Sequence, residues 1–112
     1  MGDFMNRVDA LLQQVYHDDS LNIEDLSQRL CLSYPHFYRK VKKESGLSPS
    51  RYLRRLRLEK AIDLMGFPNL TLSEIAYRVG FHTPNYFSQC FATEYGQTPS
   101  EYRKRLRADS NG

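Results

Sequence analysis

Apolar residues recur along this chain at the spacing of amphipathic helices, and the strict alternation typical of strands is nearly absent. The first such run lies at Phe4, Val8, Leu11, Leu12 and Val15. It predicts a helix that ends near His17, before a polar break at residues 18–20. We therefore expect an all-α fold.

A longer pattern of apolar and polar positions occurs twice, in residues 21–53 and in residues 70–102. The offset between the copies is 49 residues before a central turn and 50 residues after it, so the second copy carries one extra turn residue. The matched pairs are Leu21/Leu70, Leu26/Ile75, Leu30/Val79, Leu32/Phe81, Phe37/Phe87, Val41/Phe91, Gly46/Gly96, Pro49/Pro99 and Tyr52/Tyr102. The chain therefore contains a duplicated unit built from short helices.

Helix start and stop signals fall at matching places in both copies. Side chains that can cap a helix N-terminus precede each predicted helix, at Asn22, Ser33, Ser48, Thr71, Thr83 and Thr98. Acidic residues three positions later, at Asp25, Glu74 and Glu101, resemble capping boxes. Gly46 and Gly96 stand where a left-handed residue commonly ends a helix.

One long helix, from about Pro49 to Met65, is predicted to bridge the two copies. Its apolar stripe is Leu53, Leu56, Ala61, Leu64 and Met65, and its polar face is Arg51, Arg54, Arg55 and Lys60. A last helix is expected from Pro99 to about Leu106, with residues 108–112 frayed. The result is seven helices in one domain over residues 1–112: a first subdomain over about 4–48, the bridging helix over about 49–65 and a second subdomain over about 70–107.

Each copy has the layout of a helix-turn-helix unit, in which a supporting helix holds a second helix for insertion into the DNA major groove. If the apolar residues face the core, the opposite helix faces carry the candidate base-contacting residues Tyr34, Pro35, Tyr38, Arg39, Pro84, Asn85, Ser88 and Gln89. Arginine pairs well with guanine, and asparagine and glutamine pair with adenine. The alternative is that these are ordinary exposed residues on a helical scaffold, yet neither copy needs such a face in order to fold.

Charge adds to this interpretation because it is unevenly distributed. The net charge is +3, but residues 26–112 hold fifteen Lys and Arg against seven acidic residues, whereas residues 1–25 hold six acidic residues against Arg7. The basic residues cluster in residues 39–43, 51–60 and 103–107. Such patches bind a polyanion by displacing its counterions.

Several functional classes find no support in the sequence. No segment has the length and apolarity of a membrane helix, and no secretory signal is visible. His17, His36 and His82 are scattered, and Cys31 and Cys90 have no metal-ligand spacing, so we expect no metal or other cofactor. The two cysteines are expected in or at the edge of the core of a cytoplasmic protein. With no catalytic constellation and no phosphate-binding glycine loop, an enzyme is not expected.

The second copy resembles the signature of the AraC/XylS family of bacterial transcription regulators. The resemblance rests on Ile75-Ala76, Val79-Gly80-Phe81, Tyr86-Phe87-Ser88, Phe91, Gly96, Thr98-Pro99-Ser100 and Tyr102-Arg103, and it extends to the first copy and the bridging helix. It implies a sequence-specific DNA-binding regulator that places both recognition helices in successive major grooves. By position, the family's base-contacting residues correspond to Pro35, Tyr38, Arg39, Pro84, Asn85, Ser88 and Gln89.

Candidate phosphate contacts come from helix starts and from basic side chains: Asn22, Lys42, Lys43, Arg57, Thr71, Ser100 and Arg103. Arg57 has a competing interpretation, because it lies on the bridging helix and could form an internal ion pair that fixes the two units. These contacts would position the domain on DNA without reading its sequence.

Three positions depart from the family pattern. Gln89 and Ala92 stand where the family usually has Arg and Lys, and no Lys or Arg occurs between Arg78 and Arg103. Cys31 replaces a turn glycine, and a positive φ there would cost on the order of 1 kcal/mol. We therefore expect unequal units, in which Arg39 and its neighbours provide most of the affinity and a preference for guanine.

The resemblance also implies a larger parent protein. Family members commonly join this module to a ligand-binding or receiver domain, so a C-terminal fragment of a two-component response regulator or hybrid sensor is expected, with a free-standing regulator as the alternative. RNA polymerase is a plausible partner, and the absence of zipper-like heptads favours a monomer. A protein-interaction module and a nonspecific architectural DNA binder remain the rival functions.

Overall fold

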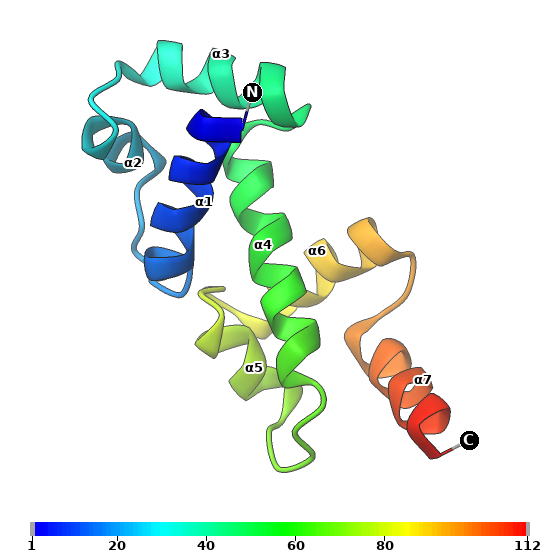
Figure 1. The fold of residues 1–112 in the computed structure, drawn as a ribbon. Helices are drawn as coiled ribbons and strands as arrows, with labels where there is room; N and C mark the ends of the chain where they lie inside the picture. The colour runs from blue at the N-terminus through cyan, green and yellow to red at the C-terminus, as the bar shows by residue number, and fades with distance from the viewer. Residues whose placement is uncertain (1, 112) are drawn as a thin grey trace.

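The computed structural model describes residues 2–111 and contains seven helices and no strand in that range. The helices are α1 (Gly2–Val15), α2 (Ile23–Arg29), α3 (Tyr34–Ser45), α4 (Pro49–Leu64), α5 (Leu72–Arg78), α6 (Pro84–Tyr95) and α7 (Pro99–Asn111). In Figure 1, α4 passes through the middle of the molecule, with α1, α2 and α3 around its first half and α5, α6 and α7 around its second half. This all-α arrangement confirms the predicted fold class.

The helices begin and end at the signals found in the sequence. Ser33, Thr71 and Thr83 each accept a hydrogen bond from a backbone N–H of the first turn of the following helix. Gly46 and Gly96 end α3 and α6 with φ angles of 80° and 73°. Because the same signals enclose both α3 and α6, the two helices have the same length and the same boundaries relative to their units.

The capping boxes differ in how completely they form. Thr98 and Glu101 form the full box, since the Thr98 N–H donates to Glu101 Oε1 at 2.9 Å and the Glu101 N–H donates to Thr98 Oγ1 at 3.1 Å. This bonding lowers the pKa of Glu101. Asn22 instead accepts from the Glu24 N–H at 2.9 Å.

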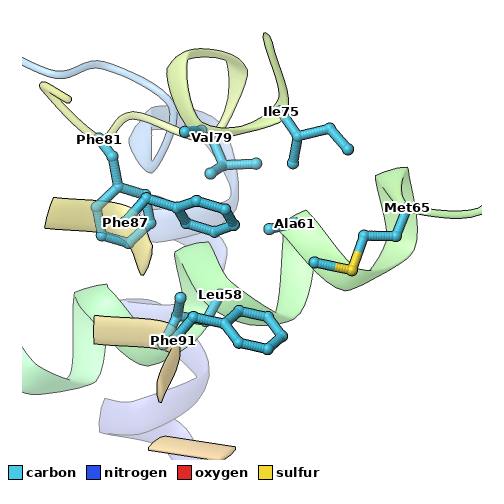
Figure 2. Close-up of a cluster of buried hydrophobic side chains, with 9 residues drawn as sticks. Leu58, Ala61, Met65, Ile75, Val79, Phe81, Phe87 and Phe91 are labelled. Atoms are coloured by element: carbon cyan, nitrogen blue, oxygen red, sulfur yellow. The ribbon is translucent and has the colours of Figure 1, made fainter. Parts of the chain in front are cut away.

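Two hydrophobic clusters form the core, one in each half of the molecule. The first consists of Phe4, Val8, Leu12, Leu26, Leu30, Phe37, Val41 and Leu53. The second, shown in Figure 2, consists of Leu58, Ala61, Met65, Ile75, Ala76, Val79, Phe81, Phe87 and Phe91. The bridging helix α4 therefore contributes Leu53 to one core and Leu58 and Ala61 to the other, and Met65 of the second core follows directly after its end.

Three expectations are corrected by the structure. The last helix does not end near Leu106 but continues to Asn111, because no glycine or proline interrupts the segment after Pro99. Cys31 is exposed rather than in or near the core, while Cys90 is partly buried as expected. Leu58, absent from the predicted apolar stripe, is buried, while Leu56 and Leu64 of that stripe are partly buried and pack against the two clusters. No helix among the described residues is long and apolar enough to cross a membrane.

Candidate nucleic-acid interface

The first recognition helix, α3, buries Phe37 and Val41 and exposes the opposite face. Tyr38, Arg39 and Lys42 lie on that exposed face, and Pro35 is exposed in the first turn. Tyr34 is partly buried against the first core and stacks edge-to-face with Tyr38, with 6.2 Å between the ring centroids. The predicted residues of α3 are therefore exposed, except Tyr34, which lies at the edge of the group and is partly buried.

The basic residues of α3 are not equivalent. Lys42 and Lys43 are exposed and make no ion pair within the described residues. Lys40 is partly buried, and its ammonium group lies 4.5 Å from the centroid of the Phe4 ring. A cation over an aromatic face is held by the ring's quadrupole, so Lys40 contacts α1.

The second recognition helix, α6, buries Phe87 and Phe91. Asn85 and Gln89 are exposed, whereas Pro84 and Ser88 are partly buried. The exposed face of α6 carries amide side chains and no positive charge of its own. Its hydrogen-bonding groups suit adenine, because an amide can donate to N7 or accept from N6 of that base.

A groove between α4 and α6 places three arginines beside this second helix. Arg51, Arg54 and Arg55 line it from α4, and Tyr86 and Gln89 line it from α6. The Arg54 Nη1 group donates to Tyr86 Oη at 3.0 Å, and Arg55 Nε lies 3.4 Å from Glu94 Oε1. The sequence pattern predicts these arginines on the polar face of α4. It does not predict their contact with α6, because that contact depends on the packing angle between the two helices.

The residues predicted to contact phosphate at helix starts are exposed, but Asn22 and Thr71 use their side chains to cap the helix. Asn22 Oδ1 and Thr71 Oγ1 each accept a backbone hydrogen bond, and Thr71 Oγ1 also donates to Glu74 Oε1 at 3.1 Å. Ser100 is exposed in the first turn of α7. Backbone N–H groups of these first turns, rather than the cap side chains, are the available donors.

Two of the predicted phosphate contacts have their guanidinium groups directed into the protein. Arg103 is only 7% exposed and donates from Nη2 to the Phe67 carbonyl at 2.6 Å. Arg57 is partly buried and donates to the carbonyls of Tyr16 and Asp18. Burial lowers the pKa of both side chains. For Arg103 this placement argues against the predicted phosphate contact, because a buried side chain cannot reach a phosphate without leaving its site.

For Arg57 the structure supports an internal role of a different kind from the one expected. Its hydrogen-bond partners are two backbone carbonyls, and no carboxylate within the part of the chain that the structure describes forms an ion pair with it. The charges of Asp18 and Asp19 nearby favour its protonated form. Arg57 thus links α4 to the loop between α1 and α2.

No metal site is formed by the described residues: they contain no group of three or more His, Cys, Asp and Glu side chains placed to hold an ion. Among the histidines, His82 Nδ1 lies 3.8 Å from Asp19 Oδ2, with both side chains largely exposed. The arrangement offers hydrogen-bonding side chains on two exposed helices rather than an enclosed reaction centre.

A family model described as a helix-turn-helix domain matches residues 26–105, which include both units and the helix between them. The transcriptional activator RhaS of Escherichia coli strain SE11 is 37% identical over 86 residues, covering 77% of this chain and 31% of RhaS. The chain belongs to the AraC/XylS family. Histidine kinase P4 of Formosa agariphila is 32% identical over 88 residues, covering 79% of this chain and 6% of the kinase.

Solved structures agree with this AraC/XylS assignment. The C-terminal domain of the two-component response regulator YesN from Fusobacterium nucleatum is 33% identical, with a TM-score of 0.82 over 90% of this chain and 98% of that domain. The DNA-binding domain of AdpA, solved in complex with a target DNA, is 27% identical, with a TM-score of 0.85 over 93% of each chain. The chain is thus a DNA-binding domain of the AraC/XylS type, and it spans less than a third of the length of either curated relative.

Proposed function

We propose that this AraC/XylS domain inserts α3 and α6 into two successive major grooves of one DNA duplex. The observation that carries the proposal is the repetition of one local structure: both helices have a capped start, a buried apolar face, a glycine end and an exposed polar face. The molecule extends 47 Å along its longest axis. That length suits two recognition elements about 34–36 Å apart, the length of one helical turn of DNA.

Within that arrangement, Arg39, Tyr38 and Pro35 contact bases from α3, while Asn85, Gln89, Ser88 and Pro84 contact bases from α6. Arg39 is exposed and suits two-point bonding to guanine. Asn85 and Gln89 are exposed and suit adenine. We assign the stronger contribution to α3, since cations accompany its exposed face whereas α6 has none.

Phosphate contacts come from Lys42, Lys43 and the first turns that follow Asn22, Thr71 and Ser100. We add Arg51 and Arg55 of α4, which are exposed beside α6 in the groove described above. They bring positive charge to the half of the molecule whose own recognition helix lacks it. These arginines reduce the difference in total charge between the two units, but α6 still lacks a cation placed, as Arg39 is on α3, to contact bases.

Selection from a random pool of duplexes of about 25 base pairs, at about 150 mM salt, tests this function. The expected product is a motif of two blocks one helical turn apart, with guanine in the block bound by α3. A single block would show that α6 does not contribute to recognition. No enrichment would contradict the proposal and favour the interaction-module alternative, in which a protein partner is bound tightly and DNA weakly.

Alanine substitutions on the selected site test the inequality of the units. Arg39→Ala is expected to weaken binding by roughly 1–3 kcal/mol and to relax the preference at one base pair. Gln89→Ala is expected to cost less. Arg29→Ala, at an exposed position on α2, is the control and should leave affinity unchanged. Equal losses for Arg39→Ala and Gln89→Ala would contradict the assignment.

The parent protein and its partners form the remaining part of the proposal. RhaS is described as an activator and YesN as a response regulator, and both names fit a regulatory parent with a sensing or receiver domain. We infer a cytoplasmic, non-enzymatic domain that is monomeric alone and activates transcription with RNA polymerase.

Sedimentation of the domain tests whether it is monomeric, and transcription in vitro from a promoter carrying the selected site tests activation. A stable dimer, or no response of the polymerase to the intact parent protein, would contradict them.

A further inference from the structure

The two halves of the molecule meet at the loop that joins α1 to α2. Tyr16, in that loop, packs against residues of both hydrophobic clusters. The ammonium group of Lys60, on α4, lies 5.6 Å from the centroid of the Tyr16 ring. A loop that belongs to the first unit by sequence is therefore also part of the packing of the second.

Arg57 holds this loop from the middle of α4. It lies between Leu53, which packs in the first core, and Leu58, which packs in the second. Its Nε group donates to the Tyr16 carbonyl at 2.7 Å, and its Nη2 group donates to the Asp18 carbonyl at 2.9 Å. Two donors of one planar guanidinium thus fix two carbonyls of the loop relative to α4, which restricts both the position and the orientation of the loop.

Gly80 brings the second unit to the same point. It lies in the turn between α5 and α6, is buried and has a φ of 105°. A Cβ atom at Gly80 would lie 2.6 Å from the Tyr16 carbonyl oxygen and 2.8 Å from Arg57 Nε. These distances are shorter than non-bonded contacts allow, so the backbone of this turn packs directly on the first-unit loop and on the arginine that holds it.

We propose that Arg57, the loop Tyr16–Asp18 and Gly80 form an interunit brace that fixes the angle between α3 and α6, and thereby sets the half-site spacing that the domain accepts. The helix α4 fixes the distance between the units, and the brace resists rocking of one unit against the other. The inference rests on the proposed insertion of both helices into DNA. It makes Arg57 a positioning residue for recognition rather than a base or phosphate contact.

Half-site spacing is a sensitive measure of such an angle. One base pair added between two half-sites moves them apart by about 3.4 Å and rotates one by about 35° around the duplex axis. A rigid pair of helices cannot follow that change without losing contacts at one site. A pair that can rock follows it in part, so loss of the brace should broaden the range of accepted spacings while lowering the affinity for the best one.

Binding is therefore to be measured on the selected site with one base pair removed, unchanged or added between its blocks. The wild-type domain is expected to lose at least about tenfold in affinity on either altered site, whereas Arg57→Ala is expected to lose less than about threefold. Arg7→Ala is the matched control, because Arg7 is exposed on α1 and lies outside the brace. It should keep the wild-type ratio between sites, whatever its absolute affinity.

Arg57→Lys gives a second variant for the case in which Arg57→Ala does not fold. Lysine keeps the charge and most of the stem but cannot place two fixed donors on two carbonyls. A broadened spacing profile in Arg57→Lys supports the brace. Uniform weakening of either variant on all three sites, with a salt dependence reduced by about one phosphate contact, would overturn the brace and make Arg57 a phosphate contact.

A measurement without DNA separates the brace from the proposed function. Spin labels at Gln28→Cys on α2 and Lys104→Cys on α7, both exposed positions, report the distance between the units in a background with Cys31→Ser and Cys90→Ser. The distance distribution should be narrow in the otherwise unchanged protein and in Arg7→Ala, and broader in Arg57→Ala. An unchanged width in Arg57→Ala would overturn the brace even if the selected DNA has two blocks. A broadened width supports the brace even if the selection yields none.

Discussion

At the scale of single residues, the backbone at Cys31 departs from the conformation that its side chain prefers. Its φ is 59°, and it is the residue of the first unit that corresponds to Gly80 in the second. Only glycine adopts this region without crowding between Cβ and the following carbonyl. The position that the family usually fills with glycine therefore has a positive φ here, and the strain considered for Cys31 applies.

We expect Cys31→Gly to raise the free energy of unfolding by about 0.5–1 kcal/mol, after allowance for the greater freedom of glycine in the unfolded chain. Urea unfolding measures this change. Cys31→Ala is the control, since alanine keeps the Cβ atom and should give no such gain. A gain of equal size in both variants would trace the effect to the thiol and not to the backbone.

Arg103 is buried, although arginine is usually an exposed residue. In the sequence it is one of several cations near the C-terminus, whereas in the structure it is buried, bonds the Phe67 carbonyl and has its Nε without a partner. Its repeat position aligns it with buried Leu53, a signal that exposed Arg107 lacks, but its contact with the turn after α4 follows only from the packing of α7.

Arg103→Ala is expected to lower the free energy of unfolding by roughly 1.5–3 kcal/mol, the usual range for a hydrogen bond from a charged donor. Arg107→Ala should change it by less than about 0.5 kcal/mol, as is usual for an exposed residue. Urea unfolding of both variants makes the comparison. If Arg103→Ala kept its stability but showed weaker dependence of DNA affinity on salt, the earlier phosphate assignment would be restored.

At the scale of helices, α1 is fixed to α4 by a polar contact as well as by the first core. The Tyr52 hydroxyl donates to Asp9 Oδ1 at 2.5 Å. Burial and this hydrogen bond to a carboxylate raise the pKa of Tyr52 to about 12. The neutral phenol is therefore favoured by the folded state, and its deprotonation opposes the attachment of α1.

The sign of the pH dependence follows from that shift. A raised pKa in the folded state contributes stability below the ordinary tyrosine pKa of about 10, and the contribution is lost as the pH rises toward 12. We expect the free energy of unfolding of the wild-type domain to fall more steeply between these values than that of Tyr52→Phe. Urea unfolding at a series of alkaline pH values measures both. Parallel curves would contradict the assignment.

Helix starts could be predicted from the sequence, whereas one apolar face of α4 was not predicted. The starts of α3, α5 and α6 could be predicted because each depends on a cap within a few residues of the helix. Leu58 was missed because α4 serves two cores in succession: Leu53 and Leu58 are five residues apart, about 140° around the helix. A single apolar stripe describes only one of the two apolar faces of α4. The spacing of Leu58, Ala61 and Met65 indicates the second face.

The candidate interface was predictable to the same degree. The exposed positions of Arg39, Asn85 and Gln89 follow from the apolar residues on the opposite faces of their helices. The groove that brings Arg51 and Arg55 beside Gln89 was not, because it depends on the angle at which α6 crosses α4. Contacts between distant segments require the tertiary structure, which local signals do not supply.

At the scale of the whole molecule, DNA affinity should depend on salt in proportion to the phosphates contacted. We expect Lys42→Ala and Lys43→Ala each to reduce the slope of log K against log salt by about 0.9 without altering the preferred sequence. Arg7→Ala, on the acidic first helix, is the control and should leave the slope unchanged. Titrations at several salt concentrations provide the slopes, and a changed base preference in either lysine variant would contradict the assignment.

The sharing of α4 by two cores has a consequence for how this chain can change over evolutionary time. One residue inserted between Leu53 and Leu58 would leave each core its own side chains but turn the second unit by about 100° and shift it by about 1.5 Å along the axis. Both units could fold and neither could meet its half-site while the other was bound. Surface residues of α3 and α6 can change independently of each other. A change in the length of α4 instead alters the placement of both units at once.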